Sequence, residues 1–600
     1  MSQAYATTRR ETRTVNGVLL VGFLGLALAV FTALDSPATG YEPSIYTATP
    51  PAVWVGVAVA VVAAAVVAVR TGVTALSRRL ALVLAGGAGW SVAALPLLRG
   101  YYFYGQGDPL SHLGFARSFA SGTLDPSGLL HPGIHLATIF VGVGAGFPLR
   151  RALLVVVFAF VLAFLVFTPL CVDAITGGGG GRVVGLFAAL LLLPLNGVGT
   201  HIVAHPSSQA ILFLPVAVYL LFRYLRSPTG GLLSVGPFGA LLALTTASFL
   251  LVHPQETMSL ALVLGTVAVV QLAVRRYWPD NAIAEHNTVY GQTAFLLGLW
   301  LLWAPRSPRV QSRLEAAATI FSSGNTAAAE TAASQSVALS AVGGSLSELF
   351  LKLFLGSLVF SLLAGPTMVG SVLGWFDDVF PDRNALNKYL AAAFVPLLAG
   401  TGFVFVGPFG DHYMRFVGFL MVVVTLVSAA ALVRLLPSAV GGFGSSAVRA
   451  GTVALLLLLL PVATMGLHPS PWMYQDTEQV TQQELRGYEA AFEHNPGDVP
   501  ISGIRGSGER YAAAIYGPNS TVERTLPGEP IPFQVFGNNV TDYYDDARYV
   551  PVRAGDVHRE VTTYNGLRYG EEGFRQLEQT PGLNRVQSTD GFRLYMLPDQ

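Results

Sequence analysis

Charged residues are scarce in this sequence of 600 residues: Asp, Glu, Lys and Arg make up 12% of it, about half the share found in an average soluble domain. Hydrophobic residues make up 52%. Cysteine occurs once, as Cys171 in an apolar run, so no internal disulfide can form. This composition excludes a disulfide scaffold, a nucleic-acid-binding protein and an ordinary cytosolic enzyme, and it predicts a membrane protein.

Lysine is almost missing, since only Lys352 and Lys388 occur. The net charge of zero hides a split between two parts of the chain. Residues 1–469 carry 24 Lys and Arg against 16 Asp and Glu, whereas residues 470–600 carry 11 against 19. A membrane-embedded basic body followed by an acidic soluble tail is the simplest interpretation. A lysine-poor, acid-rich surface is typical of a haloarchaeal, high-salt proteome, and a GC-rich genome is the alternative explanation.

Thirteen apolar stretches approach the length of about 20 residues that a bilayer requires. Their residue ranges are 16–34, 52–69, 80–98, 152–173, 182–199, 209–225, 232–252, 256–274, 290–304, 347–375, 390–407, 415–435 and 451–467. Arg9, Arg10 and Arg13 precede the first stretch. This pattern indicates an anchored first span with a cytoplasmic N-terminus rather than a cleaved signal peptide.

The segment 131–149 is apolar but short, begins with His-Pro and contains four glycines. If it does not span the membrane, 15 basic residues of the body lie on the cytoplasmic side and 9 lie outside; if it does, the ratio becomes 13 to 11. The excess of basic residues on cytoplasmic loops therefore favours a segment that lies on the membrane surface or re-enters it.

The tail is expected to be extracellular, because thirteen spans after a cytoplasmic N-terminus end outside. The sequons at Asn519 and Asn539, which can be used only on the outer face, favour the same side. We thus predict a membrane domain over 1–468 and an extracellular acidic α/β domain over 469–600. The membrane domain has two long outer loops, 99–151 and 305–346, and the second could form a partly ordered helix lying on the membrane.

Periodicity in the tail predicts a small α/β domain. The expected helices are 477–493 and 573–579, and the expected strands are 531–536, 548–552, 584–588 and 592–597. The predicted fold class is therefore mainly α: a polytopic membrane protein of about 13 transmembrane helices with a small exterior α/β domain.

Histidine marks the outer mouth of the predicted bundle. Seven of the eleven histidines fall there under the thirteen-span topology: His112, His131, His135, His201, His205, His253 and His412. Nearby acids are Asp108, Asp125, Glu256 and Asp411. One interpretation is that these histidines simply sit well at the headgroup level. The other is a shared external site, because His-Pro recurs three times at predicted span mouths and Pro is favoured at the first position of a helix. Each His would then adjoin a helix N-terminus, which suits a phosphate.

In the first long loop, Asp108 is followed by Pro109, as an N-cap residue is followed by Pro at the first helical position. A helix over 109–119 would bring Asp108, His112 and Arg117 towards one face. Asp108 is therefore either a cap alone or a cap that is also an active-site carboxylate.

The loop places an aspartate after a Gly-rich aromatic run (YYFYGQGD), then His112, Gly114 and Ala116, then a Pro-containing juxtamembrane segment. This order, with many spans and an exterior C-terminal domain, resembles the integral-membrane GT-C glycosyltransferases. FGDHYMRFVGFLMVVV (409–424) is similar to the late segment in which an Arg at the membrane surface faces the lipid phosphate. The tail has no Trp-Trp-Asp stretch, so it does not look like an oligosaccharyltransferase catalytic subunit. At 200–208, where the family often has a second acid, this chain has His201 and His205.

The resemblance implies a transferase that moves a sugar from a polyprenyl-phosphate carrier to a glycan, lipid or protein acceptor on the outer face of the cell membrane. Asp108 would be the carboxylate base and His112 a second catalytic residue. The expected substrate-binding residues are Arg117, His201, His205, His253, Glu256, His412 and Arg415. A divalent metal held by Asp108, His201 or His205 is a candidate cofactor. A lipid or polysaccharide transporter and a non-catalytic envelope scaffold are the alternatives.

Overall fold

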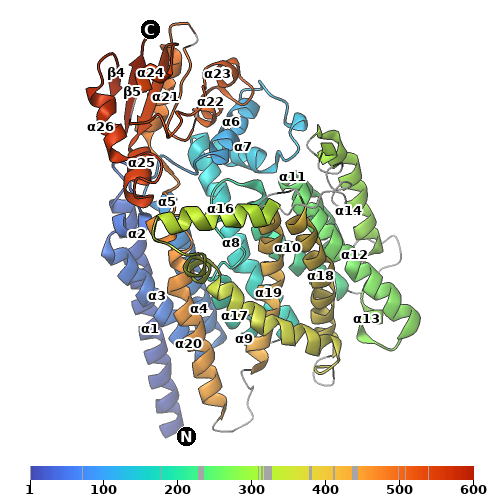
Figure 1. Cartoon of the computed structure of the whole chain (residues 1–600). Coiled ribbons are helices and arrows are strands. Elements are labelled where there is room, and N and C mark those ends of the chain that lie inside the picture. The colour runs from blue at the N-terminus through green and yellow to red at the C-terminus, as the bar shows by residue number, and fades with distance from the viewer. Residues whose placement is uncertain are drawn as a thin grey trace.

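The computed structural model of the chain is a bundle of long helices with a smaller domain at one end (Figure 1). It describes residues 2–70, 72–177, 179–227, 236–308, 310–312, 315, 327–377, 381–407, 409, 412–435, 444–497, 499–506, 508–537 and 540–599. The N-terminus lies at the end of the bundle far from the C-terminal domain (Figure 1). The predicted class, mainly α with a small α/β part near the C-terminus, is confirmed.

Eight helices in the described part of the chain are long and apolar enough to cross a membrane. They are α1 (Ser2–Asp35), α3 (Pro51–Val69), α8 (Leu149–Thr176), α10 (Pro206–Leu225), α12 (Pro254–Tyr277), α17 (Leu346–Val372), α18 (Pro381–Val406) and α19 (Tyr413–Leu435). Each coincides with a predicted span. The chain is therefore a multi-pass membrane protein, as its composition predicted.

The other five predicted spans fall on helices outside this set. These are α4 (Ala75–Ala93), α9 (Gly179–Ala189), α11 (Pro237–Val252), α14 (Tyr290–Trp303) and α20 (Gly444–Met465). The total of thirteen stays a prediction. Short helices join the long ones: α2 (Ile45–Ala48), α5 (Leu95–Leu98), η1 (Pro126–Gly128), α13 (Ala282–Glu285) and η2 (Ala304–Arg306).

The span predicted at 182–199 is helical only as far as Ala189, and the prediction is wrong beyond that residue. Residues 190–205 run without helix, because Pro194 and the glycines at 197 and 199 interrupt the periodic bonding. The buried side chain of Asn196 satisfies this backbone: its Oδ1 accepts from the N–H groups of residues 198, 199 and 200 at 2.9–3.2 Å. Irregular backbone at membrane depth is tolerated where it lines a cavity, and this stretch does so.

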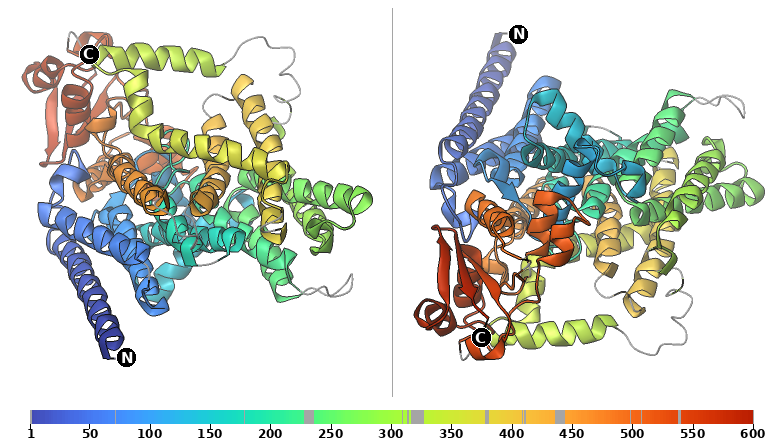
Figure 2. Two further views of the ribbon diagram at one scale, coloured as in Figure 1. Left: turned by 90° about the horizontal axis from the view of Figure 1, so that it is seen from below. Right: turned by 90° about the horizontal axis from the view of Figure 1, so that it is seen from above.

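Two further segments lie outside the pattern of parallel long helices. The doubtful segment 131–149 contains α7 (Gly133–Ala145), whose 13 residues are fewer than a straight span needs. In the second long loop, α16 (Ala327–Ala341) runs across the long helices rather than along them (Figures 1 and 2). Much of the remaining loop, 316–326 included, lies outside the described residues.

The C-terminal segment contains a three-stranded antiparallel sheet in the order β3-β5-β4. The strands are β3 (Arg548–Arg553), β4 (Asn584–Ser588) and β5 (Phe592–Leu597), as predicted. The helices are α21 (Gln482–Glu493), α22 (Glu509–Tyr516), α23 (Thr521–Thr525), α24 (Val540–Tyr543), α25 (Ala554–Val557) and α26 (Glu571–Gln579), with helical turns η4 (Pro471–Met473) and η5 (His558–Thr563). The strand predicted at 531–536 is wrong, since Pro532 cannot donate to a sheet and its carbonyl instead accepts from residues 535 and 536 in a turn.

The helix predicted at 477–493 begins only after Thr481, which forms a capping box with Glu484. Before it, β2 (Gln479–Val480) pairs antiparallel with β1 (Phe103–Tyr104) of the first long loop. The segment that links the membrane domain to the C-terminal domain is therefore hydrogen-bonded, through β2 and β1, to the membrane domain.

The C-terminal domain has two cores. One is its own and includes Ile531, Phe536, Val550 and Tyr595. The other is continuous with the membrane domain and takes in apolar residues of α21, α22 and β5. Helix α22 packs directly on α6 (Asp108–Ala120), where a Cβ at Gly114 would lie 2.1 Å from the Ala513 carbonyl oxygen. The first long loop is therefore held between the bundle and the C-terminal domain.

Candidate functional site

A polar hollow of about 230 Å³ lies where the loop 99–107, the start of α6, the loop 190–205, the start of α19 and the linker to the C-terminal domain meet. Its lining residues are Gln106, Asp108, Pro109, Val198, Gly199, His201, Val203, His205, Arg415 and Glu478. The structure therefore brings together four of the predicted site residues, namely Asp108, His201, His205 and Arg415. It adds two polar residues that the sequence did not indicate, Gln106 and Glu478.

Asp108 stands at the rim of the hollow. It is the first residue of α6 and not its cap: the N-cap is Gly107, at a φ of 68°, and no side chain caps the helix. The prediction of Asp108 as an N-cap is therefore wrong. Its carboxylate instead pairs with Arg510 of α22 at 3.0 Å, and Arg510 also donates to Ser111 at 3.1 Å. A residue of the C-terminal domain thus orients the carboxylate.

Glu478 is a second carboxylate on the same side of the hollow. Its Oε2 accepts from the Gln106 N–H at 2.5 Å, and its main-chain carbonyl accepts from the Gly105 N–H at 2.7 Å. No described residue donates to its Oε1. Burial raises the pKa of Glu478 to about 7. The turn before Asp108 therefore fixes the carboxylate of Glu478.

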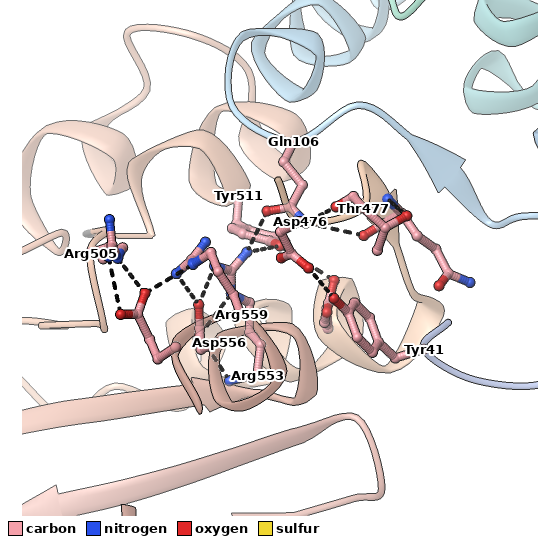
Figure 3. Close-up of polar contacts among 12 residues, drawn as sticks. Tyr41, Gln106, Asp476, Thr477, Arg505, Tyr511, Arg553, Asp556 and Arg559 are labelled. Atoms are coloured by element: carbon pink, nitrogen blue, oxygen red, sulfur yellow. Dashed lines mark hydrogen bonds and ion pairs between the residues drawn. The ribbon is translucent and has the colours of Figure 1, made fainter. Parts of the chain in front are cut away.

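A buried network behind this wall holds Gln106 (Figure 3). The Gln106 amide donates to the Thr477 carbonyl at 2.9 Å and accepts from Arg553 at 3.3 Å. Arg553 in turn forms a fork with Asp556. On the other side of the network Tyr41 donates to Asp476. Three regions of the chain, the first interhelical loop, the linker and the C-terminal domain, therefore fix the carboxylate wall.

The hollow is also lined by a cationic residue, Arg415. Arg415 is the third residue of α19 and directs a guanidinium N–H at His205 Nε2, 3.4 Å away. His205 Nδ1 lies 2.9 Å from Ser208 Oγ. Burial lowers the pKa of His205, and the nearby Arg415 charge lowers it further, so the ring is neutral and its Nε2 accepts. No described acid pairs with Arg415; Asp411, the acid nearest in sequence, lies outside the described residues.

His201 belongs to the irregular loop 190–205. Its main-chain N–H donates to Ser208 Oγ at 2.8 Å, and its Nε2 lies 3.0 Å from the Val198 carbonyl. Its ring stands edge-on to that of His205, with centroids 5.6 Å apart. Ser208 therefore connects the two histidines of the hollow.

The His-Pro pattern has the predicted helical setting at two of its three places. His205 and His253 are the N-cap residues of α10 and α12, and a proline opens each helix. His131 lies one position earlier, before Pro132, which is itself the N-cap of α7. Of the three, only His205 lines the hollow.

Four more of the predicted histidines, His112, His131, His135 and His253, form a cluster beside the hollow. His112 Nδ1 lies 3.1 Å from His135 Nε2, and the His131 ring stands between those of His112 and His253, with centroids 5.8 and 5.9 Å away. Burial lowers the pKa of His112 and of His253, so both rings are neutral. Glu256 is fully buried, with an oxygen 3.9 Å from His253 Nδ1. These residues support the wall and do not line the hollow.

Two predicted binding residues point elsewhere. Arg117 lies on another face of α6 from Asp108, since nine residues are two and a half turns, and it donates to the Ala514 carbonyl of α22 at 2.5 Å. It therefore attaches the C-terminal domain. His412 directs Nδ1 at the Phe409 carbonyl, 2.6 Å away, just before α19.

Asp108, His201 and His205 were expected to be candidate ligands of a divalent metal. All three line the hollow, but in the part of the chain that the structure describes no three His, Cys, Asp or Glu side chains are grouped to hold a metal ion.

The fold and the hollow define a multi-pass membrane protein with a polar site at one end of its bundle. By sequence, the chain matches no protein-family profile and no curated protein.

Among solved structures it is similar to ArnT from Cupriavidus metallidurans bound to undecaprenyl phosphate, with 11% identity, 87% of this chain and 98% of that chain covered, and a TM-score of 0.48. It is also similar to the oligosaccharyltransferase AglB from Archaeoglobus fulgidus in complex with an inhibitory peptide and a dolichol-phosphate. That match has 12% identity, covers 84% of this chain and 74% of that chain, and has a TM-score of 0.43.

Proposed function

We propose that this protein is a membrane glycosyltransferase that moves a sugar from a polyprenyl-phosphate carrier to an acceptor hydroxyl on the outer face of the membrane. The observation that carries the proposal is the hollow itself, where the carboxylates of Asp108 and Glu478 and the guanidinium of Arg415 line one space of about 230 Å³. Sugar transfer from a lipid phosphate needs both a base and an anion-binding group. The motif around Asp108 and the segment 409–424 resemble those of GT-C glycosyltransferases.

The transfer is a direct displacement at the anomeric carbon. The acceptor oxygen forms a bond to that carbon, the carbon–oxygen bond to the lipid phosphate breaks, and the bonding electron pair leaves with the phosphate. Asp108 takes the proton of the acceptor hydroxyl. Arg415, positioned by neutral His205, binds the phosphate oxygens and stabilises the charge that develops on them.

Glu478 faces the acceptor in this arrangement. One of its carboxylate oxygens is held by Gln106, and the other is available to a ligand in the hollow. A carboxyl group beside the base can hold a neighbouring polar hydrogen of the acceptor and so orient the attacking hydroxyl. Because Glu478 belongs to the linker, the C-terminal domain contributes to the acceptor side of the site.

The substitution Asp108→Asn tests the chemistry. An amide cannot take the proton, so we expect a loss of at least about 100-fold in turnover with unchanged folding, measured by transfer from a polyprenyl-phosphate sugar in reconstituted vesicles. Asp125→Asn is the matched control, since Asp125 is an exposed acid of the same loop that caps the turn at 126–128, and Asn caps equally well. Wild-type turnover of Asp108→Asn would remove this residue from the mechanism.

A second experiment tests the side of the membrane. We expect protease added to intact cells to release an epitope placed after residue 590, because the proposal puts the hollow and the C-terminal domain outside. A cytoplasmic loop epitope at 70–74 should stay protected until lysis. Protection of the C-terminal epitope in intact cells would reverse the proposed orientation of the site.

A further inference from the structure

A second cavity lies at the other end of the bundle from the hollow. It has a volume of about 340 Å³ and is formed where α8 and α10 end and where α9 and α11 begin. Helix α10 starts at the hollow, next to His205, and its 20 residues extend for about 30 Å. The two cavities are therefore about one bilayer core apart, and this one lies at the depth of the opposite headgroups.

Three arginines line this cavity, Arg182, Arg223 and Arg226, against one acid, Asp173. Asp173 is already paired with Arg182 at 2.8 Å, and Arg226 is paired with Asp382 at 2.9 Å. Arg223 has no carboxylate partner among the described residues. The cavity therefore keeps an uncompensated positive charge after its ion pairs are formed.

The geometry of the two arginines from α10 leaves room for an anion. The Arg223 guanidinium is exposed and lies over the Phe238 ring, 4.7 Å from its centroid, so its N–H edges stay available. The Arg226 Nε–H is buried and has no acceptor among the described residues. Both side chains have donors that a phosphate oxygen could satisfy.

The rest of the lining is apolar or aromatic, with Leu170, Phe222 and Phe238 beside the arginines. A bare inorganic anion needs no such surface, whereas the first carbons of a lipid do. We propose that this cavity binds the phosphate group of an anionic membrane lipid on the face of the membrane opposite to the hollow. Basic pockets between transmembrane helices recognise phosphate headgroups in this way.

The test uses the full chain reconstituted in vesicles of phosphatidylglycerol and phosphatidylcholine, with retained lipid counted by native mass spectrometry after extraction. We expect wild type to retain phosphatidylglycerol, and Arg223→Gln to retain it at least about fivefold less. Arg276→Gln is the matched control: Arg276 also ends a transmembrane helix and lies over an aromatic ring, but outside the cavity. Arg223→Gln leaves the two ion pairs intact, so the variant should fold.

A parallel arm uses inorganic phosphate with protein from phosphatidylcholine vesicles. Phosphate binding that depends on Arg223, without retention of phosphatidylglycerol, would assign the cavity to a soluble phosphate and overturn the lipid. Equal retention of phosphatidylglycerol by wild type and Arg223→Gln would overturn the site altogether and leave these arginines as determinants of membrane orientation.

Discussion

At the scale of single residues, the proposed chemistry depends on a guanidinium that a neutral histidine positions. Arg415→Lys keeps the charge but loses the planar fork that matches a phosphate. We expect this change to lower kcat/KM for the lipid-linked sugar by about tenfold. We expect Arg415→Ala, which loses the charge as well, to lower it by about 100-fold. These losses correspond to about 1.4 and about 2.8 kcal/mol of free energy. Initial rates over a range of lipid-linked sugar concentrations measure both.

Arg306→Lys provides the control for Arg415. Arg306 lies over Trp303, 4.6 Å from the ring, and donates to the Ser127 carbonyl outside the hollow. Its substitution should leave kcat/KM unchanged. Full activity of both Arg415 variants would show that the phosphate is bound elsewhere.

The site residues that the sequence indicated are those with a local signal. Asp108 follows a Gly-rich run, His205 belongs to a His-Pro pair, and Arg415 opens a late span. Glu478 and Arg510 could not be found in this way. Glu478 reaches the hollow through the pairing of β2 with β1, and Arg510 reaches Asp108 through the packing of α22 on α6. Arg117 carried the same kind of signal as His112, but helical phase directs it at the C-terminal domain. Contacts across several hundred residues leave no local pattern.

At the scale of elements, the irregular stretch 190–205 builds one wall of the hollow. Asn196 accepts from three main-chain N–H groups there and donates to the Met414 carbonyl at 2.9 Å, directly before Arg415. The sequence predicted a straight span, because Leu190–Leu193 continue the apolar run. Hydropathy records that a segment is buried, whereas the proline and the glycines decide that it is not helical.

Asn196→Ala should therefore damage the site and the fold together. Each buried N–H that loses its acceptor costs about 1–3 kcal/mol, and we expect a lower unfolding temperature and at least about a tenfold loss in kcat/KM per folded molecule. Asn281→Ala is the matched control, since Asn281 also accepts a main-chain N–H, that of Ile283 at 3.0 Å, but far from the hollow. Unchanged kcat/KM in Asn196→Ala would mean that the loop does not position Arg415.

At the scale of the whole molecule, the C-terminal domain and the membrane domain are joined through buried carboxyl groups. Burial raises the pKa of Glu478 and of Glu484 to about 7, and it also raises the pKa of Asp476. Composition predicted an acidic exterior domain, and these three residues are among the acids that were counted in it. They lie where the two domains meet rather than on the solvent surface. The protonation of Glu478 and Glu484 therefore changes near neutral pH.

Glu484 offers the sharpest test of this coupling. Its side chain is 1% exposed and closes the capping box at the start of α21. Because the pKa of Glu484 is about 7 in the folded protein and about 4.5 for a free glutamate side chain, the folded state binds the proton more tightly than the unfolded state between these pH values. Stability should therefore fall as pH rises through that window, by roughly 2–3 kcal/mol for this group.

Glu484→Gln keeps the capping box, since Gln serves at this position as well as Glu, but cannot ionise. We expect the fall in unfolding temperature and the rise in protease sensitivity of the C-terminal domain, between about pH 5 and pH 8, to be smaller in this variant than in wild type. Glu493→Gln, an exposed acid on the same helix, should follow the wild-type profile. A Glu484→Gln profile parallel to wild type would place the pH dependence in other groups and show that the carboxyl of Glu484 does not couple the two domains.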